Sequence, residues 1–113
     1  MDDASVRYID THAHLDFSDF NSDRHEVIAS LFDSGCVAVV NPGVDVTTSK
    51  SVLGLHAHHP TKIFTAVGIH PHEVAKYLQS GDDIFDFLHR DVEHIRSLGK
   101  SPGVVGVGEC GLD

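Results

Sequence analysis

The feature that most constrains the fold of this chain is a regular alternation of strand-like and helix-like segments. Short apolar runs typical of β-strands are separated by longer stretches whose apolar residues recur every three or four positions, as on one face of an α-helix. The predicted strands are residues 6–10, 36–40, 63–68 and 104–107, and side chains able to cap the intervening helices occur at Asn21 or Ser22, at Thr47, Thr48 or Ser49, and at Asp82 or Asp83. This βαβαβαβ order predicts an α/β protein with a parallel sheet and right-handed crossovers.

The number of predicted strands indicates which parallel architecture to expect. A (β/α)8 barrel needs about 250 residues, so four strands and three helices in 113 residues correspond to the first half of a TIM barrel. An open, four-stranded flavodoxin-like sheet is the alternative. The barrel is favoured because polar residues follow the first, third and fourth strands, and a barrel gathers such residues at its C-terminal rim. Residues 1–113 are therefore expected to form the N-terminal part of one domain, an incomplete barrel.

The charge of the chain restricts the ways in which it can bind nucleic acid. Lys and Arg number 8 and Asp and Glu number 17, which gives a formal net charge of −9. This balance argues against binding through a broad basic face. It remains compatible with a phosphodiester substrate held by metal ions, because bound cations dominate the local field.

The two cysteines and the N-terminus bear on the compartment in which the protein works. Cys36 and Cys110 are far apart in the sequence and form neither a zinc knuckle nor a disulfide framework, so both are expected to be free thiols in a reducing compartment. The start of the chain is acidic and has no apolar stretch typical of a signal peptide. The longest strongly apolar run, residues 36–40, is too short to span a bilayer. We expect a cytoplasmic protein, with the nucleus as the alternative, and no membrane partner.

Two histidines that follow the first predicted strand form half of a candidate metal site. If the strand continues through them, Asp10, His12 and His14 face the same side, because side chains on a strand alternate with period two. Two converging imidazoles suit Zn, Fe, Ni or Cu, and an added carboxylate admits Mg or Mn. Two polar residues at the start of a loop are the alternative interpretation. Asp10 is expected either to hydrogen-bond one of these histidines or to fix the loop.

Glu109 supplies the carboxylate in this hypothesis. It follows the fourth predicted strand, so in a barrel it lies on the same rim as His12 and His14. Two imidazoles and a carboxylate form a divalent-metal site with room for a water molecule, which the metal converts into a nucleophile. If a second ion binds, the carboxylate can bridge the pair. A solvated loop acid is the alternative for Glu109.

Three ordered motifs resemble those of a known family. Residues 10–16 (DTHAHLD) resemble the opening motif of the TatD-related deoxyribonucleases, residues 68–72 (GIHPH) their second motif, and residues 108–113 (GECGLD) their third. Residues 41–45 (NPGVD) also fit the end of the family's second strand. The resemblance extends over nearly the whole chain, and three motifs in order are far more specific than any one of them.

The resemblance implies a metal-dependent, amidohydrolase-like TIM-barrel hydrolase that cleaves DNA phosphodiester bonds with one or two divalent ions, Mg, Mn or Zn. His12 and His14 would bind one ion, and Glu109 would bridge two and act as the catalytic carboxylate. His70 would contact the substrate phosphate or support a ligand, and Asp113 would be a motif residue near the site. DNA is then the expected partner.

The resemblance also indicates what the chain lacks. Family members draw two further histidines and an aspartate from later strands, and a zinc site normally has four ligands, or three and a water. One alternative is therefore an inactive half-barrel fragment that binds metal weakly or self-associates through its uncovered sheet edge. Another is a related amidohydrolase-like enzyme that acts on a different substrate.

The remaining polar candidates are expected to have structural or solvent-exposed roles. His56, His58 and His59 end the second predicted helix, where cations are favoured, and are expected to be solvated. His72 is expected at a helix start or on the surface. Asp16 is expected to cap a helix or to be solvated.

Overall fold

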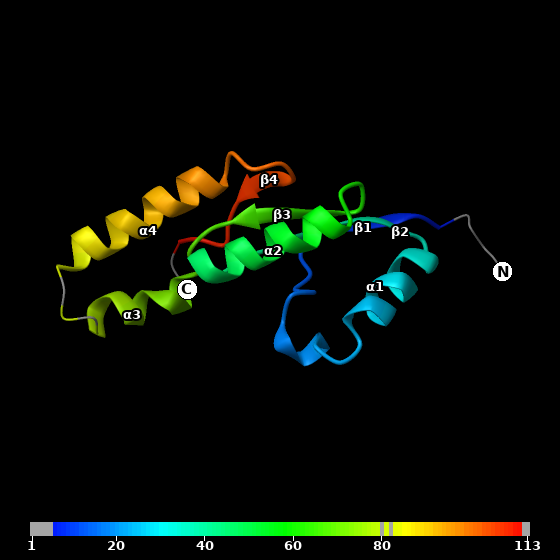
Figure 1. The fold of residues 1–113 in the computed structure, drawn as a ribbon, viewed down its shortest axis with the longest axis horizontal. Coiled ribbons are helices and arrows are strands. Elements are labelled where there is room, and N and C mark those ends of the chain that lie inside the picture. Colours follow the sequence, from blue (N-terminus) through cyan, green and yellow to red (C-terminus); the bar gives the residue numbers. More distant parts are fainter. Residues whose placement is uncertain (1–5, 80, 82, 112–113) are drawn as a thin grey trace.

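The computed structural model describes residues 6–79, 81 and 83–111. Strands and helices alternate along the chain (Figure 1). In order they are β1 (Tyr8–Asp10), η1 (Ser18–Phe20), α1 (Arg24–Asp33), β2 (Cys36–Pro42), α2 (Val46–His58), β3 (Ile63–Val67), η2 (Pro71–Glu73), α3 (Val74–Gln79), α4 (Ile84–Leu98) and β4 (Val104–Val107). The predicted α/β order is confirmed.

The sheet topology distinguishes between the two architectures considered. The strands lie in the order β1-β2-β3-β4, and each neighbouring pair is parallel. A flavodoxin-like sheet has the order 2-1-3-4-5, so that alternative is wrong. Right-handed crossovers that always advance to the next strand place their helices on one face. Four parallel strands joined in this way correspond to the first half of a (β/α)8 barrel.

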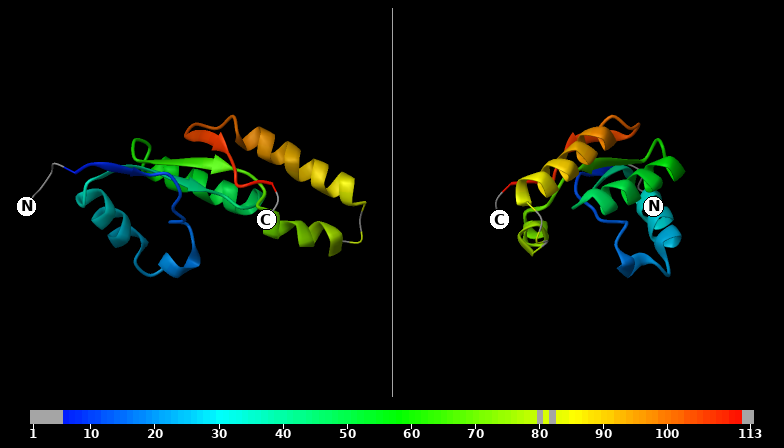
Figure 2. Two further views of the ribbon diagram at one scale, coloured as in Figure 1. Left: turned by 180° about the vertical axis from the view of Figure 1, so that it is seen from behind. Right: turned by 60° about the vertical axis from the view of Figure 1, so that its left-hand side comes forward.

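The hydrophobic core lies between the sheet and the helices that cover one of its faces. Figure 2 shows α1 and α2 on the same side of the strands. Ile28 of α1 and Cys36, Val39 and Ile63 of the sheet pack together with Leu15, which follows β1. Along β3, burial alternates with period two, because every second side chain points towards the helices.

Apolar side chains on the first and last strands of the sheet are open to solvent. Ile9 of β1 is 58% exposed, and Val105 and Val107 of β4 are 60% and 75% exposed. Both strands lie at the edges of the sheet.

In the part of the chain that the structure describes, no helix has both the length and the apolar content needed to cross a membrane.

Two of the predicted helix starts differ from those observed. α2 begins at Val46 and is capped by Asp45, whose side chain accepts from the backbone of Thr48 in a reciprocal capping box. The residue before α1 is Asp23, which makes no side-chain cap. At the third predicted helix, Asp83 caps α4 as expected, and Asp82 lies outside the described residues.

Helix α3 was not predicted, because its residues follow a proline-containing loop and lack a long apolar period. Its Tyr77 is almost fully buried, and the Tyr77 hydroxyl donates a 2.7 Å hydrogen bond to Asp91 of α4. Asp91 interrupts the apolar face of α4 and serves as the acceptor for this hydrogen bond. The pKa of Tyr77 is raised well above its ordinary value, first by burial of the ring and then by the hydrogen bond to the Asp91 carboxylate and its charge.

Candidate metal centre

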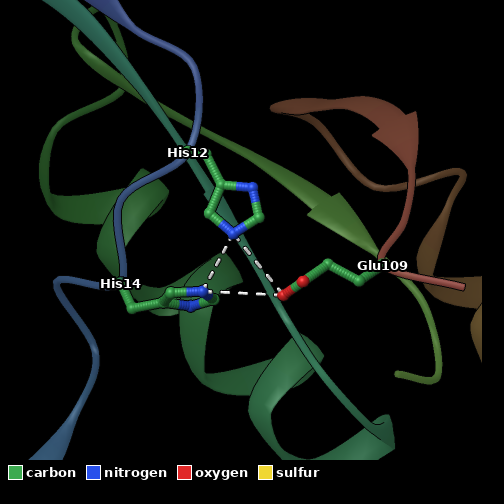
Figure 3. A group of neighbouring side chains, drawn as sticks. All are labelled: His12, His14 and Glu109. Atoms are coloured by element: carbon green, nitrogen blue, oxygen red, sulfur yellow. Dashed lines mark hydrogen bonds and ion pairs between the residues drawn. The ribbon is translucent and has the colours of Figure 1, made fainter. Parts of the chain in front are cut away.

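The candidate centre forms where residues from the two edges of the sheet meet. β1 and β4 are separated by β2 and β3, and three strand spacings amount to about 14 Å in a flat sheet. His12 and His14 nevertheless point to the same centre as Glu109 (Figure 3). This convergence requires a curled sheet whose loops lean across the strand ends, as in a barrel.

The three ligand atoms form a nearly equilateral triangle. The Nε2 atoms of His12 and His14 are 3.1 Å apart, and Oε2 of Glu109 lies 3.6 Å and 3.5 Å from them. A position in the plane of this triangle and equidistant from the three atoms lies about 2.0 Å from each, which matches the length of zinc–nitrogen and zinc–carboxylate bonds. Among the described residues, these three form the group that could hold a metal ion, with all ligand atoms within 4.8 Å of one another.

The exposure of the centre leaves room for further ligands. The His12 side chain is 55% exposed, whereas the side chains of His14 and Glu109 are 21% and 26% exposed. The centre is thus anchored on one side by half-buried groups and open on the other. A catalytic metal site keeps such an open position for water or substrate.

The loop that carries the histidines is held by main-chain hydrogen bonds. Asp10 accepts a 3.0 Å bond from the N–H of His12, which is the loop-fixing role of the two considered for this residue. The N–H of Ala13 donates to the carbonyl of Val40 in β2 at 3.2 Å. The loop therefore continues alongside β2 after β1 has ended.

Stacking holds the His14 ring. Its plane lies 13° from that of Phe17, with ring centroids 4.5 Å apart. Within the described residues, Nδ1 of His14 is buried without a hydrogen-bond partner, so packing supports the ring. The contribution of Phe17 was not predicted; its signal in the sequence is an aromatic residue three positions after His14.

His70 contacts the other oxygen of Glu109. Its Nε2 lies 3.4 Å from Oε1, while Oε2 faces the two histidines. The N–H of His72 donates to Nδ1 of His70 at 3.0 Å. Since Nδ1 acts as an acceptor, the neutral His70 ring carries its proton on Nε2, facing the carboxylate. The structure thus brings His70 to the centre through Glu109, while Asp113 lies outside the described residues.

The expectations for the remaining histidines and for the cysteines can also be compared with the structure. His56 was predicted to be solvated, and this is wrong: its Nδ1 donates a 2.6 Å hydrogen bond to the carbonyl of Ile63, because the end of α2 lies against the start of β3. His59 is half-buried, and burial, followed by the charges of nearby residues, lowers its pKa. His72 is exposed, as expected. Cys36 and Cys110 are both free.

Asn41 is a further residue near the centre whose contribution was not predicted. It is completely buried at the end of β2. A polar side chain at the end of an otherwise apolar strand is the signal that could have identified it, because buried amides need hydrogen-bond partners.

Comparison with known proteins shows the same family over nearly the whole chain. The family model described as "TatD related DNase" matches residues 9–113. A protein of Erwinia tasmaniensis and one of Salmonella typhimurium, each named "3'-5' ssDNA/RNA exonuclease TatD", are 30% identical over 104 residues. The relative of the same name in Musicola paradisiaca is 32% identical. In all three cases the match covers 92% of this chain and 36% of the relative, so the chain spans about a third of their length. This chain belongs to the TatD-related DNase family.

Proposed function

We propose that residues 1–113 are the N-terminal, metal-binding part of a hydrolase that cleaves phosphodiester bonds in nucleic acid. The observation that carries this proposal is the triangle formed by His12, His14 and Glu109, whose size fits a divalent ion. Family membership and relatives named as exonucleases of single-stranded DNA and RNA support the substrate class. DNA is the substrate that we propose.

His12, His14 and Glu109 would hold the ion, which when bound supplies Lewis-acid stabilisation of the phosphate and lowers the pKa of a coordinated water. Two imidazoles and a carboxylate are compatible with Zn or Mn, and the carboxylate also suits Mg. The exposed side of His12 leaves the centre open to the substrate. The chain carries a net charge of −9 and so does not offer a broad basic face to a phosphate. Bound cations would supply the positive charge that attracts the phosphate instead.

The other residues of the centre orient the ligands. The Nε2–H of His70 faces Oε1 of Glu109, which leaves Oε2 directed at the histidines. Asp10 holds the main chain at His12, and Phe17 holds the plane of the His14 ring. Each contact restricts the ligands before an ion binds. The ligand side chains therefore lose less conformational freedom on binding.

The test combines metal binding with cleavage of single-stranded DNA by the 113-residue protein. We expect calorimetry with Zn²⁺ or Mn²⁺ to show stoichiometric binding that is lost in the His12→Ala/His14→Ala double variant. His58→Ala is the matched control, because His58 is exposed at the end of α2. Cleavage is expected to stop after treatment with a chelator. Cleavage that survives both the chelator and the double substitution would refute the mechanism.

Binding without cleavage would be informative about this chain in particular. It would support a metal-binding half-barrel that is inactive without ligands from later strands, the alternative set out from the sequence. The two outcomes are distinguished by measuring binding and cleavage on the same preparation.

A further inference from the structure

We infer that Asn41 is a positioning residue, which fixes the loop after β1 so that His12 and His14 face Glu109. The inference rests on the proposed function for its link to metal binding. Asn41 is completely buried at the end of β2. Its Oδ1 accepts a 2.7 Å hydrogen bond from the N–H of Leu15, and its Nδ2 donates a 2.9 Å hydrogen bond to Oδ1 of Asp16.

The side chain of Asn41 extends the pairing between the first loop and β2. The N–H of Ala13 reaches the main-chain carbonyl of Val40. Two residues later, the N–H of Leu15 reaches the side-chain carbonyl of Asn41. Both neighbours of His14 in the chain are thus tied to β2, one by main chain and one by side chain.

The same loop is held from its other side by Arg24, the first residue of α1. Its Nε donates to the carbonyl of Leu15 at 2.7 Å, and its Nη2 donates to the carbonyl of Phe17 at 2.8 Å. Leu15 is therefore bonded at both its N–H and its carbonyl. Phe17, whose carbonyl is bonded by Arg24, is also the residue on which the His14 ring stacks.

Asp16 completes this arrangement. Its carboxylate is half-buried, and one oxygen accepts from the buried amide of Asn41. Replacing Asn41 with Asp keeps an acceptor for Leu15 but places a second carboxylate at hydrogen-bond distance from Asp16. The loop must then move to separate the two charges. A second substitution, Asp16→Asn, removes the clash, because an amide can donate to the new carboxylate.

The experiment measures the Zn²⁺ affinity of the 113-residue protein together with the hydrogen-exchange protection of the Leu15 amide without metal. For Asn41→Asp we expect a loss of affinity of about 10- to 100-fold and faster exchange at Leu15. Asp16→Asn alone should retain the affinity to within roughly threefold, and the double variant should recover most of the loss. Tyr77→Phe, which loses a buried hydrogen bond between α3 and α4, is the control for a general loss of stability.

If the wild-type chain binds the ion, any of four results would overturn the inference. The first is wild-type affinity in Asn41→Asp, and the second is a double variant no better than Asn41→Asp. The third is an equal loss of affinity in Tyr77→Phe. A large loss in Asp16→Asn alone would instead make Asp16 a ligand. If the wild-type chain binds no ion, the proposed function fails and the exchange data decide: protection of Leu15 that is unchanged in Asn41→Asp overturns the inference, and protection lost in that variant but kept in Tyr77→Phe upholds it.

Discussion

The turn before β4 offers a quantitative test of how the strand that leads to Glu109 is anchored. Gly103 has a φ of +89°, a conformation that side-chain-bearing residues rarely adopt. A Cβ placed there would overlap the ring of His56. The carbonyl of Gly103 accepts a 2.9 Å hydrogen bond from Thr65 of β3. Gly103→Ala therefore perturbs the backbone, the His56 ring and the start of β4 together.

The expected cost is the sum of two contributions. A left-handed conformation costs a residue with a Cβ about 1–2 kcal/mol. Moving the His56 ring breaks its hydrogen bond to Ile63, which contributes about 0.5–1.5 kcal/mol. We expect Gly103→Ala to lower the free energy of unfolding by about 1.5–3.5 kcal/mol, and the urea midpoint by roughly 1 M or more.

Two other glycines provide matched controls for urea unfolding followed by circular dichroism. Gly81 also has a positive φ, +77°, but a Cβ there meets nothing within 4 Å, so Gly81→Ala measures the backbone contribution alone. Gly54 is exposed in α2 with open space around it, and Gly54→Ala should be neutral or stabilising by up to about 1 kcal/mol. If Gly103→Ala costs no more than Gly81→Ala, the overlap with His56 is not the cause. An unchanged midpoint would refute the reasoning altogether.

Two further predictions concern the outer helices and the edge of the sheet. Burial raises the pKa of Tyr77, so its neutral form stabilises the fold fully below about pH 10, and the free energy of unfolding of the wild type should fall above that pH. Tyr77→Phe should lower the free energy of unfolding by about 1 kcal/mol at pH 7, and its free energy of unfolding should fall less steeply at high pH. Parallel pH profiles of the two proteins in urea unfolding would contradict this. The exposed edge strand β4 should drive concentration-dependent self-association in sedimentation experiments, and Val105→Lys/Val107→Lys should suppress it because charged side chains block edge pairing. Leu78→Lys, on α3 and 70% exposed, is the control, and a wild-type protein that stays monomeric at all concentrations would refute the prediction.

The fold was largely predictable because the signals that define it are local. Apolar periodicity identified the four strands, and their order with three intervening helices predicted the parallel sheet that is observed. The start of α2 was missed because Asp45 and Thr48 cap each other reciprocally, a pairing that only the folded backbone reveals. Helix α3 was missed because its stability depends on burying Tyr77 against α4.

The role of His56 illustrates what local patterns omit. Its place at the end of a helix suggested a solvated cation, since helix C-termini favour positive charge. The observed bond to Ile63 depends on how α2 returns to β3. The space for the ring depends on Gly103, which is far away in sequence. Neither condition can be inferred from the helix alone.

The sequence predicted that His12 and His14 converge, but the cause observed in the structure differs from the predicted one. The period-two pattern requires a strand through both residues, but β1 ends at Asp10. Beyond that point, backbone N–H groups of the loop donate to the carboxylate of Asp10 at the end of β1 and, in β2, to the main-chain carbonyl of Val40 and the side-chain oxygen of Asn41. The identity of the converging residues was therefore accessible from the motif, whereas its cause was not. Since two of the three acceptors come from β2, substitutions there should change the site without touching any candidate ligand.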